Sequence, residues 1–486
     1  MICAVITEKS AEEFLRAIAR ALERADLVEL RLDYLDLPIN LAPLLAAARG
    51  KAVVTCRPRS QGGFFKGAEK DRLDLLLRAD EAGAAYVDVE FACLGRLSRR
   101  LARAKLILSH HDFEKMPLDL PEIARSMESA GADVVKVVGF ARDAADNAVI
   151  FDILKNARRP TVALAMGEFG LASRILAPRF GAAWTYASVQ KGAESAPGQI
   201  TIEELRGLYH DDRIGPATRL YGVIANPVAH SASPAIMNAA FVETGFDGVY
   251  VPLRVRDVAS TVRAFRAVPF DGYSVTIPHK TAVMDCLDEV EPLAARVGAV
   301  NTVVRGRDGK LAGFNTDLVG AMTALEKALL DGNLRGRAVL VIGAGGAARA
   351  IVFGLMDRGA RVTIANRTVS RAESLAKEAG AQFCGLDDLE SRGAEILVNC
   401  TSVGMHPHID ETPVPVSCLR KGMIVFDTVY NPIETRLLAE AARRGAKTVS
   451  GLEMFIGQAA RQFELWTGLQ APREVMENAL RRKLGA

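Results

Sequence analysis

The chain has 486 residues, more than one hydrophobic core usually serves, so two or three domains are expected. Its 61 basic and 58 acidic side chains leave a formal charge of only +3, without the excess of positive charge that is typical of a nucleic-acid-binding protein. No apolar run approaches the length of a membrane span or signal-peptide core, and the seven cysteines have no metal-binding spacing. We therefore expect a cytoplasmic protein with reduced thiols and no structural metal site, which binds neither nucleic acid nor membranes.

Residues 1–210 alternate short apolar runs with helix-like segments. Runs that are apolar throughout and separated by helices are typical of parallel strands buried on both faces. Eight of them in succession predict a (β/α)8 barrel, close to the lower size limit of that fold. The eight runs are Ile2–Thr7, Leu27–Tyr34, Ala52–Arg57, Tyr86–Phe91, Lys105–His111, Asp133–Phe140, Thr161–Gly167 and Trp184–Val189.

Lys136 lies within the sixth run, where an unpaired ammonium is costly to bury. Two interpretations follow from the residues alone. Either the lysine is structural and pairs with a carboxylate, or burial lowers its pKa so that it attacks a ketone and forms a Schiff base. His111 ends the neighbouring run, at the barrel end where active sites form, and could move the proton that an iminium makes acidic. A capping histidine is the alternative there.

Charged residues recur at the ends of the other runs. Arginine forks bind carboxylates in bidentate fashion, so the array predicts a ligand that carries a carboxylate. The residues are Glu29, Arg31, Arg57, Asp88, Glu90 and Arg174.

Together these motifs resemble the type I 3-dehydroquinate dehydratases over essentially all eight barrel units. The motifs are Glu29-Leu-Arg31, the loop from Arg57 to Gly63, His111-Asp112-Phe113, Lys136, Ser173-Arg174 and Ser195-Ala-Pro-Gly-Gln199. The resemblance implies that Lys136 forms the Schiff base and that His111 is the general acid and base. It also implies that the substrate's hydroxyls and carboxylate are held by Glu29, Arg31, Arg57, Arg174, Ser195 and Gln199.

Gln61 departs from this resemblance, because the family usually has a glutamate there that is thought to orient the catalytic histidine. An amide keeps a hydrogen bond but loses the charge, so we expect slower turnover rather than an inactive site. His110 stands where another polar residue is more usual, so the two histidines could share duties. A class I aldolase-type barrel stays open, although the arginines and the segment Ser195–Gln199 argue against it. A third possibility also stays open, namely a barrel that has become a binding or scaffolding module. Gln61 would then be the first change that impaired catalysis.

A short linker at 211–218 is expected to lead into further α/β structure. The tail Leu452–Leu484 looks helical throughout. The expected strands are Leu220–Ala225, Val249–Val255, Tyr273–Ile277, Asn301–Arg305, Ala338–Val341, Arg361–Asn366, Ile396–Thr401 and Met423–Val429.

A dinucleotide fingerprint follows the expected strand Ala338–Val341 and opens a helix. Its residues are Gly343, Ala344, Gly345, Gly346, Ala347 and Ala348. About 20 residues on, an NAD enzyme places an acid against the ribose. This chain has Asn366, Arg367, Thr368 and Arg371 instead. Arginines attract a 2′-phosphate, so NADP is the predicted cofactor, and the alternative is that they merely solvate a loop.

Three segments rich in small polar residues, 226–234, 274–280 and 298–317, precede the fingerprint. With it they resemble the shikimate dehydrogenases from about Arg219 onward. The resemblance implies a substrate-binding domain at 219–320, completed by helices at 452–486, and a Rossmann NADP-binding domain at 321–451. It implies Lys280 and Asp317 as the catalytic pair. Shikimate contacts would be Ser231, Ser233, Thr276, Asn301, Tyr430 and Gln458, and Thr428 and Gly451 would join the glycine loop against the nucleotide.

The combined expectation is a chain that dehydrates 3-dehydroquinate to 3-dehydroshikimate and then reduces that product to shikimate with NADPH. Small-molecule substrates are its expected partners. The order of the fused domains resembles the bifunctional plant enzymes, but the chain begins on its first barrel strand, so a bacterial cytoplasmic version is expected. A quinate-preferring dehydrogenase remains open, although Ser231, Ser233 and Thr276 favour shikimate.

Overall fold

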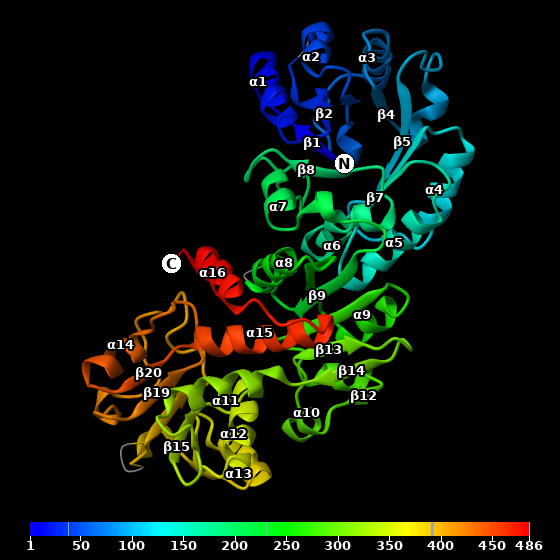
Figure 1. The fold of residues 1–486 in the computed structure, drawn as a ribbon. Helices are drawn as coiled ribbons and strands as arrows, with labels where there is room; N and C mark the ends of the chain where they lie inside the picture. The colour runs from blue at the N-terminus through cyan, green and yellow to red at the C-terminus, as the bar shows by residue number, and fades with distance from the viewer. Residues whose placement is uncertain (37, 230, 390–392, 486) are drawn as a thin grey trace. The chain divides into compact units, whose positions relative to one another are not determined.

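The computed structural model describes residues 1–36, 38–229, 231–389 and 393–485 (Figure 1). Their elements fall into two compact units, one of residues 1–229 with 247–270 and the other of residues 230–246 with 271–486. Of the helices formed by these residues, none combines the length and the apolar character needed to cross a bilayer. The predicted α/β class is confirmed in both units.

The first unit contains the predicted barrel of eight parallel strands. The strand order is β7-β6-β5-β4-β3-β2-β1-β8, so the first and last strands are neighbours. Leu32–Tyr34, expected to extend the second strand, form a 3-10 turn instead, since Asp33 folds back to pair with Arg31. The strands are β1 (Ile2–Ile6), β2 (Leu27–Arg31), β3 (Ala52–Thr55), β4 (Tyr86–Glu90), β5 (Lys105–His111), β6 (Val134–Phe140), β7 (Thr161–Met166) and β8 (Thr185–Ser188).

Helices connect the barrel strands with one exception. The connection from β4 to β5 makes only 3-10 turns over Phe91–Arg96, so one of the eight expected β/α units lacks its helix. Helix α1 begins with a capping box, in which the Ser10 and Glu13 side chains bond each other's backbone N–H groups. The helices are α1 (Ala11–Leu22), α2 (Leu41–Ala47), α3 (Glu69–Glu81), α4 (Leu120–Ser129), α5 (Asn147–Asn156), α6 (Leu171–Ile175) and α7 (Ile202–Gly207).

The first unit continues through the expected linker, which is held in place by hydrogen bonds. Thr218 Oγ1 donates to Asp247 Oδ1 at 2.7 Å. Beyond it, β9 and β10 pair in parallel. Thr261 Oγ1 donates to Asp143, just after β6, at 2.6 Å. The added elements are β9 (Arg219–Ala225), β10 (Gly248–Arg254) and α9 (Val258–Phe265).

The second unit opens with the strand order β11-β13-β14-β12. β13 pairs antiparallel with β11 and β14, whereas β12 runs parallel to β14. Two of these strands were not predicted, because they are too short to show a periodic pattern. The elements here are α8 (Ser233–Thr244), β11 (Phe270–Val275), β12 (Glu289–Val290), α10 (Pro292–Val297), β13 (Thr302–Arg305), β14 (Leu311–Phe314) and α11 (Thr316–Ala328).

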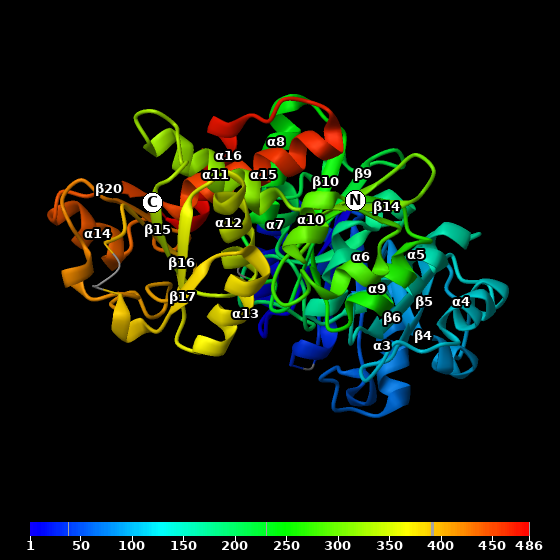
Figure 2. The same ribbon diagram turned by 90° about the horizontal axis from the view of Figure 1, so that it is seen from below.

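A six-stranded parallel sheet follows, in the order β17-β16-β15-β18-β19-β20. This is the dinucleotide-binding order, with a reversal between β15 and β18. Helices α12 and α13 lie beside its strands in both views (Figures 1 and 2). The elements are β15 (Ala338–Ile342), α12 (Gly346–Asp357), β16 (Arg361–Ala365), α13 (Val369–Ala379), β17 (Gln382–Cys384), β18 (Ile396–Asn399), β19 (Ile424–Asp427), α14 (Arg436–Arg443) and β20 (Lys447–Val449).

The C-terminal tail consists of two helices, which agrees with the helical tail that was expected. They are α15 (Gly451–Thr467) and α16 (Arg473–Leu484). Gly468 breaks the helix with a φ of 72°, and Pro472, which lacks a backbone N–H, precedes the second helix. Helix α15 packs closely on α11, where Gly320 leaves room for it: a Cβ there would lie 2.7 Å from Met454 O.

Candidate active sites

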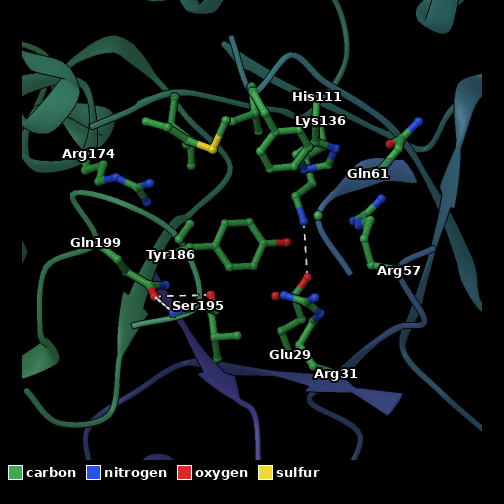
Figure 3. Close-up of a pocket in the computed structure, with 17 residues that line it drawn as sticks. Glu29, Arg31, Arg57, Gln61, His111, Lys136, Arg174, Tyr186, Ser195 and Gln199 are labelled. Atoms are coloured by element: carbon green, nitrogen blue, oxygen red, sulfur yellow. Dashed lines mark hydrogen bonds and ion pairs between the residues drawn. The ribbon is translucent and has the colours of Figure 1, made fainter. Parts of the chain in front are cut away.

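One pocket in the barrel gathers the eight residues that the family resemblance implied for the first site, whereas Asp88 and Glu90 do not line it (Figure 3). Their side chains come from different strands and loops, because the carboxyl ends of parallel barrel strands meet at one rim. The predicted residues that line it are Glu29, Arg31, Arg57, His111, Lys136, Arg174, Ser195 and Gln199, together with Gln61.

Lys136 on β6 is ion-paired inside this pocket. Its Nζ lies 2.9 Å from Asp88 Oδ2 and 3.1 Å from Glu29 Oε1. The side chain is 6% exposed, and Nζ lies 4.3 Å from the ring centre of Tyr186. The two interpretations of this lysine therefore coexist: Asp88 and Glu29 hold the ammonium, and Glu29 can take its proton when the amine attacks a ligand.

Arg57 and the acidic residues around it form a buried charge network. Arg57 lies 2.8 Å from Asp88 and 2.8 Å from Glu90, and Arg72 on α3 lies 2.8 Å from the second oxygen of Glu90. Burial alone lowers the pKa of Arg57, but Asp88 and Glu90 outweigh it and leave the pKa raised. Burial alone raises the pKa of Asp88, but Arg57 and Lys136 outweigh it and leave the pKa far below its ordinary value. Arg57 and Asp88 therefore stay charged.

The three arginines predicted to bind a carboxylate are not equivalent. Arg31 donates to both oxygens of Asp33, at 2.9 and 2.8 Å, and Arg57 is paired within the barrel. Arg174 Nε and Nη2 are buried and have no hydrogen-bond partner among the residues that the structure describes. Burial lowers the pKa of Arg174 to about 10, which still leaves it protonated at neutral pH. Arg174 is thus the arginine best placed for a ligand carboxylate.

His111 is held as a neutral imidazole. Burial lowers its pKa well below the ordinary value, and the nearby charges of Arg57 and Lys136 lower it further. Among the residues that the structure describes, His111 Nδ1 and Gln61 Oε1 are both buried without a hydrogen-bond partner, so the hydrogen bond expected between these side chains is not formed through these two atoms. His110 does not line the pocket.

The segment Ser195–Gln199 forms a tight loop at the pocket. Ser195 donates from its backbone N–H and its hydroxyl to Gln199 Oε1, at 2.7 and 3.2 Å. Gly198 has a φ of +71°, and a Cβ there would lie 2.4 Å from Gly167 O. The loop therefore packs against the end of β7 in a way that only glycine permits.

Three polar residues of this site were not predicted. Tyr186 stands inside the expected eighth run, whose apolar pattern predicts a core position, but its side chain lines the pocket. Asp33 follows Arg31 by two positions, a spacing that could have indicated the pair. Arg72 lies in a helix, where nothing local indicates that its guanidinium turns into the barrel.

In the second unit, Lys280 and Asp317 form an ion pair with Nζ and Oδ2 2.5 Å apart. Asp317 lies in the first turn of α11, which Asn315 caps by accepting from the backbone N–H of Leu318. A Cβ on Gly346 would lie 3.8 Å from Lys280 Cδ. The lysine therefore lies beside the start of α12, where the dinucleotide fingerprint is.

Asn301 joins α11 to α15. Its Oδ1 accepts from the Thr316 backbone N–H at 2.8 Å, and its Nδ2 lies 3.5 Å from Gln458 Oε1. The other predicted shikimate residues have separate contacts. Ser233 N–H donates to Ser231 Oγ at 3.3 Å, Tyr430 stacks on Phe455 with ring centres 4.3 Å apart, and Thr276 is half-buried after β11.

The glycine loop lies where the strand order of the Rossmann sheet reverses. Gly343 has a φ of +112°, and a Cβ there would lie 3.2 Å from the Cys400 carbonyl. A Cβ on Gly345 would meet nothing within 4 Å, which leaves its backbone open to a ligand. A Cβ on Gly451 would lie 2.5 Å from Thr428 O, so these two predicted cofactor residues do meet. The glycine loop and the segment around Gly451 therefore suit a dinucleotide.

The predicted 2′-phosphate residues follow β16. Asn366 Nδ2 donates to Thr368 O at 2.9 Å and shapes the turn. Arg367 and Arg371 are exposed, and within the described ranges neither guanidinium has an ion-pair partner. Both are free to meet an anion. No group of three His, Cys, Asp or Glu side chains among the described residues is placed to hold a metal ion.

The barrel site and the lysine–aspartate site beside a Rossmann loop define the class of the protein, a dehydratase barrel joined to a dehydrogenase. Residues 2–216 match the model of the type I 3-dehydroquinases. Residues 223–303 match the shikimate dehydrogenase substrate binding domain, residues 324–432 match shikimate / quinate 5-dehydrogenase, and residues 451–481 match the shikimate 5′-dehydrogenase C-terminal domain.

The chain is 42% identical to a chloroplastic bifunctional 3-dehydroquinate dehydratase/shikimate dehydrogenase of Arabidopsis thaliana, over 98% of this chain and 83% of that one. It is 43% identical to a shikimate dehydrogenase (NADP(+)) of Bacillus cereus, over 55% of this chain and 99% of that one. The structure of a Thermus thermophilus shikimate 5-dehydrogenase with NADP(H) and shikimate matches with a TM-score of 0.51 and 39% identity, over 55% of this chain and 100% of that one. The chain belongs to the bifunctional 3-dehydroquinate dehydratase/shikimate dehydrogenase family.

Proposed function

We propose that the barrel dehydrates 3-dehydroquinate to 3-dehydroshikimate and that the second unit reduces this product to shikimate with NADPH. The observation that carries the proposal is Lys136, held by two carboxylates in the same pocket as His111 and the unpaired Arg174. The names of the relatives support the pairing of the two activities.

In the barrel, Lys136 gives its ammonium proton to Glu29 and adds to the C3 carbonyl carbon. The carbonyl oxygen leaves as water and a carbon–nitrogen double bond forms. His111 takes the C2 proton, the C1–oxygen bond breaks, and the hydroxide leaves as water with that proton. Water then cleaves the iminium and releases 3-dehydroshikimate and free Lys136. Arg174 holds the carboxylate throughout, and the ring hydroxyls are held by Glu29, Arg31, Arg57, Ser195 and Gln199.

In the second unit, Lys280 donates a proton to the oxygen of the ketone that is reduced, and its ion pair with Asp317 holds the lysine in place. When bound, NADPH supplies the hydride. The shikimate ring is held by Ser231, Ser233, Thr276, Asn301, Tyr430 and Gln458. The nucleotide is held by Gly343, Ala344, Gly345, Gly346, Ala347, Thr428 and Gly451, with Asn366, Arg367, Thr368 and Arg371 around its 2′-phosphate.

The Schiff base can be tested by trapping. With 3-dehydroquinate and borohydride, the wild-type chain should lose dehydratase activity and gain the mass of the reduced adduct on Lys136 by peptide mass spectrometry. Lys136→Ala should show neither effect, because it removes the nucleophile. Dehydrogenase activity toward 3-dehydroshikimate is the internal control and should stay unchanged. Mass on another residue, or dehydratase activity in Lys136→Ala, would refute the assignment.

Cofactor choice can be tested at Arg367. A charged hydrogen bond to a phosphate contributes about 1.5–3 kcal/mol, so Arg367→Ala should lower kcat/KM for NADP by at least about tenfold. The value for NAD should barely change, because NAD has no 2′-phosphate. Adding Asn366→Asp should shift the preference toward NAD. The measurement is shikimate oxidation with both nucleotides, and a parallel loss for both would mean that Arg367 does not contact the phosphate.

A quinate-preferring dehydrogenase is the second candidate, because the matched model for residues 324–432 covers shikimate and quinate enzymes alike. Ser231, Ser233 and Thr276 are all present in the described part of the chain and favour shikimate. Side-by-side kcat/KM values for the two substrates decide between them.

We also propose that the protein works in the cytoplasm. No disulfide is formed by the seven cysteines, all of which lie in the described ranges, and five of them are buried. Cysteines without disulfides are typical of reducing compartments. Cell fractionation tests this location.

A further inference from the structure

Tyr186 on β8 brings a phenol into the dehydratase pocket. The residue is 4% exposed and lines the same pocket as Lys136 and Arg174 (Figure 3). Its Oη is buried, and it has no hydrogen-bond partner among the residues that the structure describes. The neighbouring indole N–H of Trp184 approaches this oxygen and lowers the pKa of Tyr186 by less than burial raises it, but among the described residues neither atom makes a hydrogen bond of normal geometry.

A buried hydroxyl without a partner calls for an explanation, because folding removes it from water and returns no hydrogen bond. A phenylalanine would fill the same space without that cost. The ring alone already serves Lys136, whose Nζ lies 4.3 Å from the ring centre in a cation–π contact. The hydroxyl is therefore left to form a hydrogen bond with a ligand.

The hydroxyl points toward Lys136 and Glu29 (Figure 3). These two groups are themselves paired at 3.1 Å, so the phenol faces the place where a ligand carbonyl must lie to meet the lysine amine. Burial, and then the charge of Glu29, hold the pKa of Tyr186 well above its ordinary value. The phenol therefore remains an O–H donor across the working pH range.

We propose that Tyr186 is a further catalytic residue of the dehydratase, whose hydroxyl donates a hydrogen bond to the carbonyl oxygen of the substrate while Lys136 adds to the carbonyl carbon. This inference rests on the proposed Schiff-base function. The hydrogen bond stabilises the charge that develops on that oxygen as the carbon–nitrogen bond forms, and the oxygen then leaves as water. No proton needs to leave Tyr186 permanently.

Tyr186→Phe tests the proposal, because it removes one oxygen and keeps the ring against Lys136. We expect dehydratase kcat/KM to fall about tenfold, the effect of one hydrogen bond that strengthens in the transition state. The rate at which substrate becomes trappable by borohydride on Lys136 in a single turnover should fall by the same factor. Tyr209→Phe, a buried tyrosine of the barrel outside the pocket, is the matched control and should leave both rates unchanged.

Dehydrogenase activity and the melting temperature of each variant complete the experiment. If Tyr186→Phe matches the wild type in trapping rate and kcat/KM, the inference is overturned while the Schiff-base function stands. It is also overturned if the variant loses dehydrogenase activity and melting temperature in proportion, since the effect is then structural. If the wild type traps no substrate on Lys136, the proposed function and this inference fail together.

Discussion

Arg174 differs from the other arginines of the dehydratase pocket, because no carboxylate of the described residues forms an ion pair with it. Arg57 and Arg31 are satisfied within the protein, at 2.8 Å from Asp88 and 2.8 Å from Asp33. An unpaired buried cation costs stability until an anion arrives. That cost makes sense only if the anion is a ligand, so this single guanidinium is the strongest structural argument that the pocket binds a carboxylate.

Gln61→Glu should raise dehydratase turnover and move its pH profile. His111 now has a pKa well below its ordinary value, so it is neutral at neutral pH and becomes protonated only in more acidic solution. A carboxylate nearby favours the charged imidazole, raises the pKa of His111, and moves the acidic limb of kcat/KM to higher pH. It should also orient the imidazole and raise turnover at neutral pH about tenfold, or about 1.4 kcal/mol.

The pH dependence of kcat/KM for Gln61→Glu and the wild type provides the measurement. Gln61→Met is the control, since it removes the amide without adding charge and should leave the acidic limb where it is. An unchanged limb in Gln61→Glu, or lower turnover, would show that the loop has adapted to the amide.

The loop Ser195–Gln199 depends on a glycine more than on its hydrogen bonds. Gly198→Ala would place a Cβ 2.4 Å from Gly167 O, so the loop must move away from β7. A displacement of about 1 Å in a substrate-positioning element can cost about a hundredfold in rate, and we expect a loss of that order in dehydratase kcat/KM. Gly192→Ala is the matched control, because Gly192 also has a positive φ, +86°, but faces open space.

Steady-state dehydratase kinetics of the two alanine variants separate contact from backbone strain. Dehydrogenase activity should stay constant in both. Equal losses in Gly198→Ala and Gly192→Ala would mean that the left-handed backbone, rather than the contact with Gly167, sets the loop.

Each of the two proposed sites is built from residues of one unit. The dehydratase pocket uses side chains between Val5 and Gln199, and the dehydrogenase contacts run from Ser231 to Gln458. Lys136→Ala and Lys280→Ala should therefore each block the conversion of 3-dehydroquinate to shikimate, but at different steps. An equimolar mixture of the two variants should restore NADPH oxidation, after a lag in which 3-dehydroshikimate accumulates in solution.

The test follows NADPH absorbance after 3-dehydroquinate is added to each variant and to their mixture. Doubling the concentration of the mixture should shorten the lag, because the intermediate travels through solution. A mixture that stays inactive would show that the intermediate must pass within one chain.

The sequence by itself determined the barrel, the Rossmann domain and most of the residues of the first pocket. Apolar runs and glycine spacings are local signals, and parallel strands carry their functional residues at one end, so Lys136 and His111 could be placed near each other from neighbouring runs. Their catalytic roles rested on the family resemblance. Short edge strands such as β17, three residues long, were missed because they contain too few residues to show a period. The pattern did not give the position of the break at Gly468, because helical residues lie on both sides of it.

Only the tertiary structure decided which charges are satisfied and which are left for a ligand. Lys136 donates a hydrogen bond to Glu29, which is 107 positions away in the chain, and Arg57 donates one to Ser109, which is 52 positions away. No local pattern gives such partners, since they depend on how the strands close into a barrel. The way the strands close also points the side chain of Tyr186, which the apolar pattern would place in the core, into the pocket. It leaves Arg174 without an ion-pair partner among the described residues. A sequence shows which groups are present, but burial and distance decide which of them are free to act.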